Sequence, residues 1–223
     1  MSGTILIVFD IDGTLTDYNK YIKDTAIPYF QNRYNLKIIN QNALEIEDIF
    51  DIKASYITEG LSNEQAQNKE TALLDKYWVS HRFIHFALLV RYRKHCATFL
   101  KWLKKNGFSV QIHSSRAKCT DHSTIGSIAR CFTMLQCWIN GIFLEPSDFF
   151  FYKDDSAKTN GIISAKPLIA FDDKPEIISK LNSANIHTCC VSGTHNSGCS
   201  DTKLNIVISS YEETYLKERI LIY

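Results

Sequence analysis

Two pairs of carboxylates stand out as residues whose type and position could carry chemistry. Asp10 and Asp12, and much later Asp172 and Asp173, each come at the end of a short run of β-prone apolar residues. Such runs are typical of strands that are buried on both faces of a parallel sheet, and ligands bind at the carboxyl ends of those strands. Clustered carboxylates repel one another unless a cation joins them, and Mg²⁺ prefers oxygen ligands. The four acids therefore predict a magnesium site.

The rest of the chain offers the elements that such a site needs. Six runs of residues are expected to form strands: 4–9, 108–113, 148–152, 167–171, 186–191 and 204–209. Helical patterns are found at 94–106, 121–140, 174–183 and 211–220. From residue 94 onward strand and helix alternate, which is typical of an α/β fold with a parallel sheet. The predicted fold is a doubly wound, Rossmann-like parallel sheet with helices on both faces.

Residues 17–93 interrupt this alternation. They show helical patterning and no convincing strand, with apolar residues such as Leu73 and Tyr77 recurring at the spacing of one helix face. We therefore expect a catalytic core formed by residues 1–16 and 94–223, and a helical cap, residues 17–93, inserted after the first strand.

The bulk composition limits the possible partners. The chain has 223 residues, of which 45% are hydrophobic and 22% charged, as in a globular protein that buries a proper core. Its formal net charge of +1 gives no general attraction to nucleic acid or to an anionic membrane. No apolar run approaches the ~18 residues that cross a bilayer. Neither a membrane nor a nucleic acid is expected as a partner.

The cysteines bear on the compartment. Seven cysteines are an odd number, and none is arranged as CxxC. The expected strand begins close to Met1, which leaves no room for a signal peptide. We expect free thiols and a reducing, cytoplasmic location. The histidines and cysteines between 187 and 199 match no familiar spacing of zinc ligands, so no zinc site is expected.

Four motifs follow one another in a fixed order. They are Asp10-Ile11-Asp12-Gly13-Thr14-Leu15, then Ser114-Ser115-Arg116, then Lys153-Asp154-Asp155-Ser156-Ala157-Lys158, and finally Asp172-Asp173. Together they resemble the haloacid dehalogenase (HAD) superfamily of phosphatases, motif by motif, over roughly residues 4–16 and 94–191. The lysine-bearing segment is similar to that of polynucleotide kinase-phosphatases, and the double acid is similar to that of the 5′-nucleotidases of this superfamily.

The resemblance implies an aspartyl-phosphate mechanism. Asp10 would be the nucleophile that attacks phosphorus, and Asp12 would act first as general acid and then as general base. Binding of phosphate or substrate is implied for Gly13, Thr14, Ser114, Ser115, Arg116 and Lys158. Magnesium would be held by Asp10, by the backbone carbonyl of Asp12, and by Asp172 and Asp173, with Asp172 preferred as the direct ligand.

The identity of the lysine is left open by the residues alone. Lys153, Lys158 and Lys166 are all candidates. We prefer Lys158, because its distance along the chain from Asp172 resembles that in polynucleotide kinase-phosphatases.

The serine and the second acid of the last motif also have alternatives. Ser115 could replace Ser114, which we prefer because the family often has Ser/Thr-x-Arg here. Arg116 would then contact the substrate or lock the loop. Asp173 could cap the following helix instead of binding the metal.

These expectations lead to a magnesium-dependent phosphomonoester hydrolase that acts on a small phosphorylated metabolite. The cap would serve as a lid that selects the substrate. A nucleoside monophosphate is the first choice and a sugar phosphate the second. The alternatives are a phosphatase of polynucleotide ends, a phosphomutase, and a catalytically inactive domain that binds a phosphorylated ligand. The sequence does not predict an oligomeric state.

Overall fold

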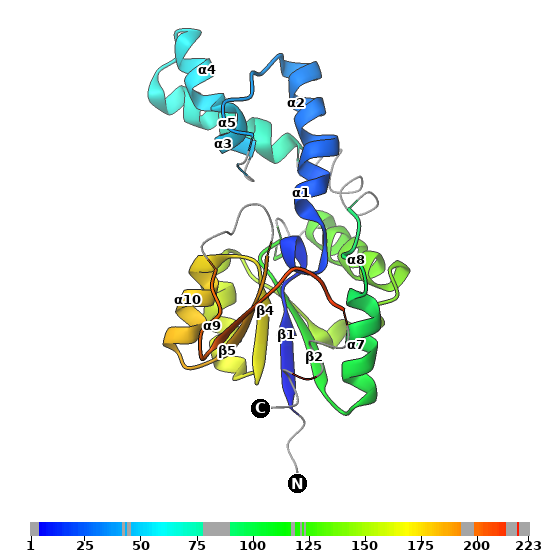
Figure 1. Cartoon of the computed structure of the whole chain (residues 1–223). Helices are drawn as coiled ribbons and strands as arrows, with labels where there is room; N and C mark the ends of the chain where they lie inside the picture. The colour runs from blue at the N-terminus through cyan, green and yellow to red at the C-terminus, as the bar shows by residue number, and fades with distance from the viewer. Residues whose placement is uncertain are drawn as a thin grey trace. The chain divides into compact units, whose positions relative to one another are not determined.

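The computed structural model describes residues 5–41, 43, 46–77, 90–116, 119, 120, 122, 124–192, 199–212 and 218. The chain forms two compact units (Figure 1). Met1–Asp17 and Arg91–Tyr223 form the first, which we call the core, and Tyr18–Val90 form the second, which we call the cap unit. All the predicted catalytic and metal-binding residues belong to the core.

The core is built on a parallel sheet. Its strands are β1 (Leu6–Phe9), β2 (Ser109–Ser114), β3 (Phe149–Phe151), β4 (Ile169–Asp172), β5 (His187–Val191) and β6 (Asn205–Ile208). Their order is β3-β2-β1-β4-β5-β6, and each neighbouring pair is parallel. The six predicted strands and the doubly wound sheet are therefore confirmed. The two strands that precede the acidic pairs, β1 and β4, are direct neighbours at the centre of the sheet.

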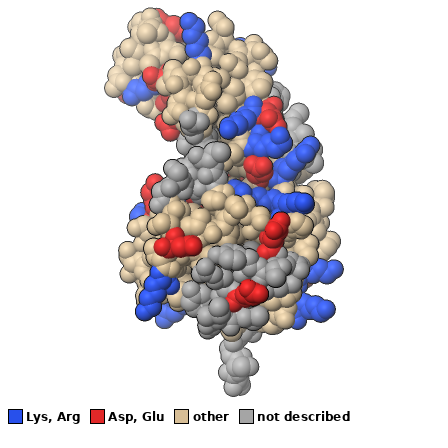
Figure 2. Space-filling view, viewed as in Figure 1, with Lys and Arg blue, Asp and Glu red and all other residues tan. Residues whose placement is uncertain are grey.

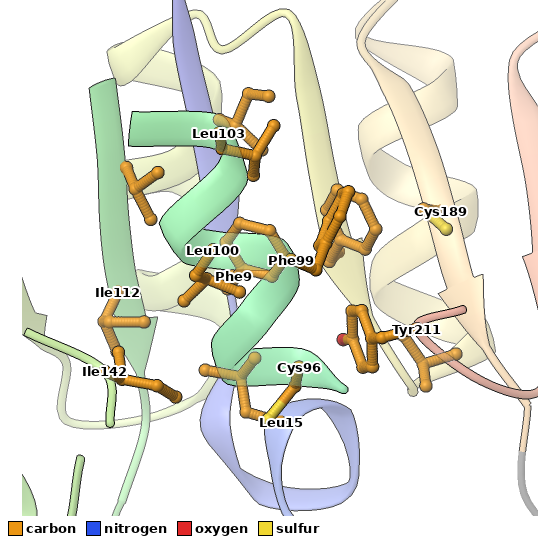
Figure 3. Close-up of a cluster of buried hydrophobic side chains, with 14 of the residues drawn as sticks. Phe9, Leu15, Cys96, Phe99, Leu100, Leu103, Ile112, Ile142, Cys189 and Tyr211 are labelled. Atoms are coloured by element: carbon orange, nitrogen blue, oxygen red, sulfur yellow. The ribbon is translucent and has the colours of Figure 1, made fainter. Parts of the chain in front are cut away.

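Helices cover both faces of this sheet. The core helices are α7 (Cys96–Lys105), α8 (Thr124–Ile139), α9 (Asp155–Ala165) and α10 (Pro175–Ser183). Successive side chains of β1 point to opposite faces. Phe9 packs with Phe99 of α7, with 6.2 Å between ring centroids, in a cluster that also contains Tyr211 (Figure 3). Val8 belongs to the cluster on the other face, with Leu181 of α10. The two hydrophobic layers fix β1, and with it the motif that follows.

Three of the four predicted helices of the core are confirmed as α7, α8 and α10, with ends that differ by a few residues. Most of the fourth predicted helix, 211–220, lies outside the described residues. Residue 121, where the second predicted helix was expected to begin, lies outside them too. Helix α9 was not predicted from the sequence. It has no continuous apolar face, because small and polar residues surround its few apolar ones. Among the described residues, no helix is both long enough and apolar enough to cross a membrane.

The cap unit is helical throughout its described elements. These are α1 (Tyr18–Tyr21), η2 (Ile22–Ala26), α2 (Ile27–Tyr34), α3 (Ile46–Phe50), α4 (Ile52–Thr58) and α5 (Asn63–Lys76). Ser62 begins α5 with a capping box, in which it and Gln65 satisfy each other's backbone N–H groups. Aromatic rings form the centre of the unit, where Phe30 lies 4.7 Å from Tyr77 and 5.7 Å from Phe50 between ring centroids. The cap unit thus has a hydrophobic core of its own.

The two segments of the core that lead to the cap unit run side by side. Thr16 and Tyr92 form an antiparallel bridge, and the backbone N–H of Asp17 donates to the carbonyl of Arg91 at 2.7 Å. The chain therefore leaves the core and returns to it at one place.

One expectation about the cysteines is corrected. Cys190 in β5 and Cys199 form a disulfide, whereas free thiols had been expected. Five other cysteines are free, and only Cys131 among them is exposed. The spacing of the cysteines along the sequence does not reveal this pairing. A disulfide is no argument for a reducing compartment, so the cytoplasmic location stays a prediction.

Candidate active site

The acidic pairs converge because β1 and β4 are adjacent. The backbone N–H of Asp10, which follows β1, donates to the carbonyl of Phe171 in β4 at 2.9 Å. Asp10, Asp172 and Asp173 are all buried, and each offers a carboxylate oxygen within 4.8 Å of the others. Asp10 and the adjacent pair Asp172-Asp173, which are far apart in the sequence, thus share one small volume at the carboxyl ends of the strands.

A buried lysine lies between two of these acids. The ammonium of Lys158 is 3.1 Å from Asp10 Oδ1 and 2.9 Å from Asp172 Oδ2. Its side chain is 1% exposed. The two other candidate lysines are on the surface: the side chain of Lys153 is 79% exposed, and Lys166 ends α9 as an exposed residue. Of the three lysines, only Lys158 contacts the acids.

The start of α9 explains how Lys158 reaches this position. The side chain of Asp154 accepts a hydrogen bond from the backbone N–H of Ala157 at 2.7 Å, which is the interaction of a helix N-cap. Lys158 then lies in the first turn of α9, and its backbone N–H donates to the carbonyl of Asp154 at 3.0 Å. The acidic residues of the lysine-bearing motif therefore begin the helix rather than join the acid cluster.

Burial and charge act against each other in the cluster. Burial raises the pKa of Asp10 well above its ordinary value; Lys158 opposes this, while Asp172, Asp173 and Asp12 add to it. Burial also raises the pKa of Asp172. For Lys158, burial disfavours the ammonium, but Asp10 and Asp172 outweigh it and raise the lysine's pKa. Lys158 is thus held in its charged form by its neighbours.

The turn after β1, η1 (Ile11–Leu15), requires glycine at position 13 and is held by two hydrogen bonds from other parts of the core. Gly13 has a left-handed backbone (φ 82°), and a Cβ at this position would overlap the carboxylate of Asp173. Arg93 Nε donates to the Gly13 carbonyl at 2.9 Å. The Tyr211 hydroxyl donates to the Thr14 carbonyl at 3.3 Å. Thr14 Oγ1 is buried and has no hydrogen-bond partner among the described residues.

The two serines of the second motif face different partners. Ser114 ends β2 and is buried, and its hydroxyl oxygen accepts the backbone N–H of Arg116 at 3.2 Å. Ser115 instead donates to Asp155. Asp155 also forms an ion pair with Lys174 at 2.7 Å. Burial tends to raise the pKa of Asp155, but its hydrogen bonds with Lys174 and Ser115 prevail and lower it. Ser115 therefore belongs to a polar group beside the acid cluster.

Arg116 binds Asp12. Its Nε donates to Asp12 Oδ2 at 3.0 Å and its Nη2 donates to Asp12 Oδ1 at 2.6 Å. From the other side, Nη1 donates to Thr133 Oγ1 at 3.2 Å and to Gln136 Oε1 at 2.9 Å. From the sequence, Arg116 was expected either to contact the substrate or to lock the loop. Thr133 and Gln136 were not predicted as its partners. The pattern that could have indicated them is a pair of polar residues, three positions apart, in helix α8.

The donor set fits a hard divalent cation. Asp10, Asp172 and Asp173 offer only carboxylate oxygens, and Lys158 contacts the first two. Three clustered carboxylates suit Mg²⁺, which binds through oxygen ligands and supplies two charges. The Asp12 carboxylate pairs with Arg116 and is not part of this acid group. That Asp12 binds the metal through its backbone carbonyl stays a prediction.

Solved structures with the same fold are found in several bacteria. A predicted phosphatase from Clostridium acetobutylicum is 15% identical with a TM-score of 0.62, and each chain is covered to 99%. A β-phosphoglucomutase from Clostridium difficile is 17% identical with a TM-score of 0.55, and the coverage is 99% of this chain and 98% of that one. A HAD-hydrolase from Bacillus subtilis, bound to magnesium, is 16% identical with a TM-score of 0.54, over 97% and 99% of the two chains.

No curated protein sequence matches the chain. A family model of haloacid dehalogenase-like hydrolases matches residues 7–128, which is more than half of the chain. The match includes the Asp10-x-Asp12 motif and the Ser114-Ser115-Arg116 motif, which are joined by the ion pair between Asp12 and Arg116. The chain belongs to the haloacid dehalogenase-like hydrolases.

Proposed function

We propose that the protein is a magnesium-dependent phosphomonoester hydrolase that works through an aspartyl-phosphate intermediate. One observation carries the proposal: Asp10 lies in a buried cluster with Asp172 and Asp173, and Lys158 contacts both Asp10 and Asp172. A nucleophilic carboxylate needs a positive environment, because the phosphate that it attacks is itself an anion. Magnesium, when bound to these acids, supplies charge that draws the phosphate in and stabilises the transition state.

The residues of the chain divide the work in two steps. In the first, an oxygen of Asp10 forms a bond to phosphorus, the bond to the ester oxygen breaks, and Asp12 gives that oxygen a proton. In the second, Asp12 takes a proton from water, the water oxygen attacks phosphorus, and the bond to Asp10 breaks. Lys158 holds Asp10 in place and offsets negative charge in both steps. The hydroxyl of Ser114 donates to a phosphoryl oxygen.

The substrate that we propose is a small phosphorylated metabolite. A nucleoside monophosphate is favoured, by the similarity of the double acid to that of 5′-nucleotidases, and a sugar phosphate is next. Lys and Arg side chains are interspersed with acidic ones on the face drawn in Figure 2, and the net charge is +1. Neither feature favours a polynucleotide, whose backbone attracts continuous basic surfaces. The cap unit, which has its own hydrophobic core, would act as the lid.

A phosphomutase is the second candidate, because a β-phosphoglucomutase is among the proteins with the same fold. The two activities share the attack by Asp10. They differ in whether water or a hydroxyl of a phosphorylated sugar accepts the phosphoryl group from the enzyme.

Release of inorganic phosphate from a panel of nucleoside monophosphates and sugar phosphates, in buffer with Mg²⁺, tests the proposal. We expect turnover of at least one compound and none by Asp10→Asn. Glu145→Gln, which removes the charge of an exposed carboxylate of the core before β3, is the matched control and should be fully active. Full turnover by Asp10→Asn would refute Asp10 as the nucleophile.

The same panel separates the alternatives. Conversion of a hexose phosphate to its isomer without net phosphate release would identify a mutase. Faster hydrolysis of a 3′-phosphorylated oligonucleotide than of free nucleotides would identify a phosphatase of nucleic-acid ends. Binding of Mg²⁺ with no turnover of any compound would favour an inactive, ligand-binding domain.

A further inference from the structure

We propose that Arg116 is a positioning residue that acts through Asp12: it orients the Asp12 carboxylate so that proton transfer to the leaving oxygen is efficient. This inference rests on the proposed function and names a residue that tunes its proton-transfer step. The guanidinium holds both oxygens of Asp12 in a bidentate pair, with distances of 2.6 and 3.0 Å. Such a pair fixes the rotation of the carboxylate as well as its position.

Arg116 is itself held rigidly. Its side chain is 3% exposed, and its Nη1 is bound by Thr133 and Gln136, one turn apart on α8. Because α8 packs on the sheet through Cys137 in the main hydrophobic cluster, the helix provides a fixed support. A chain of contacts thus runs from the core through Thr133 and Gln136 to Arg116 and then to Asp12.

The two members of the ion pair differ in their access to solvent. The side chain of Asp12 is 27% exposed, whereas that of Arg116 is 3% exposed. Asp12 is therefore anchored on its buried side and reachable on the other, as a proton donor to a bound ester must be. A phosphate group would have to displace Asp12 to reach the guanidinium, which argues against Arg116 as a direct ligand of the substrate.

This arrangement predicts a dependence on the leaving group. An alkyl alcohol, as in a nucleoside or sugar phosphate, leaves only with a proton, whereas 4-nitrophenolate leaves without one. Loss of orientation at Asp12 should therefore slow phosphoryl transfer to Asp10, which kcat/KM reports, much more for alkyl esters than for 4-nitrophenyl phosphate. The second step, in which Asp12 activates water, is the same for both esters. General acid catalysis contributes roughly 10²- to 10⁴-fold, so we expect kcat/KM of Arg116→Gln to fall about 10²-fold on the alkyl ester and less than about 10-fold on the aryl ester.

A double-mutant cycle with Asp12→Asn provides the decisive measurement. If Arg116 acts through Asp12, the Asp12→Asn/Arg116→Gln protein should be no slower on the alkyl ester than Asp12→Asn alone. Arg116→Lys should recover part of the activity, because it keeps the charge but not the bidentate geometry. Lys105→Gln, at an exposed position of α7 in the core, removes a positive charge away from the site; it is the control and should leave kcat and kcat/KM unchanged on both esters.

Each other outcome overturns the inference. A raised KM with unchanged kcat would mean that Arg116 binds the substrate. Equal losses of kcat/KM on the two esters would mean a merely structural role, and losses of kcat/KM that multiply in the double mutant would mean independent action. If Arg116→Gln does not fold, Thr133→Val, which keeps the guanidinium and removes one support, should show the same preference for the aryl ester at smaller amplitude. Activity of Asp10→Asn, in contrast, would contradict the proposed function itself.

Discussion

His113 should make the stability of the fold depend on pH. It is a buried residue of β2, with Nδ1 3.0 Å from the Tyr152 hydroxyl and Nε2 3.2 Å from Gln111 Oε1. Its ring stacks on Phe150, with 4.8 Å between centroids. Burial, and to a lesser extent the charge of Lys158, lowers the pKa of His113 from 6.5 to about 4. The folded protein therefore keeps this imidazole neutral in mild acid.

The sign and size of the effect follow from this difference. The unfolded chain takes up a proton near pH 6.5, whereas the folded chain does so only near pH 4. Between these values the unfolded state binds more protons, so the free energy of unfolding falls as the pH falls. The free energy of unfolding contains the full contribution of neutral His113 above pH 6.5, and this contribution is lost as the pH falls towards 4. Acidification from about pH 7 to about pH 5 should cost about 2 kcal/mol through this residue.

Urea unfolding of the wild type and of His113→Gln, each at the two pH values, measures the effect. Other groups contribute as well: because burial raises the pKa values of Asp10 and Asp172, these two carboxyls stabilise the fold as the pH falls. Because both proteins share those groups, their contributions cancel in the comparison. We expect the wild type to lose about 2 kcal/mol more than the variant on acidification. An equal loss in the two proteins would contradict the argument from burial.

Four further outcomes are expected. Lys158→Met should lower kcat at least ~10²-fold, and the thermal shift on adding Mg²⁺ should exceed that of the wild type, since the metal then replaces the missing charge. Gly13→Ala, which drives a methyl group against Asp173, should abolish phosphate release while leaving the far-ultraviolet circular dichroism unchanged. Tyr211→Phe removes the hydrogen bond to Thr14 and should lower the free energy of unfolding by about 1 kcal/mol, measured in urea. Chelation by EDTA should stop turnover, and added Mg²⁺ should restore it.

The strands could be predicted because their physical signal is local. A strand buried on both faces reads as an uninterrupted apolar run, and the runs that lead to Asp10 and Asp172 end where the acids begin. Helix α9 lacks such a signal. Its first turn contains Lys158, which is buried because it contacts acids that follow or end two other strands. Without those contacts, the residue pattern of the helix resembles that of a polar surface segment.

The candidate site was predictable to the extent that its residues end strands or belong to motifs. The acids of β1 and β4 had to meet once the two strands were neighbours. The partners of Arg116 could not be foreseen in the same way, because Thr133 and Gln136 reach it only through the packing of α8. The spacing of the cysteines likewise does not reveal the disulfide between Cys190 and Cys199.

The bridge between Thr16 and Tyr92 has an evolutionary consequence. Since the backbone is already paired where the insertion departs and comes back, the ends of any inserted segment are held together before that segment folds. The entropy of closing the loop then depends little on what is inserted. Inserted segments of different length should therefore be accommodated at this junction while the acids of the sheet keep their places.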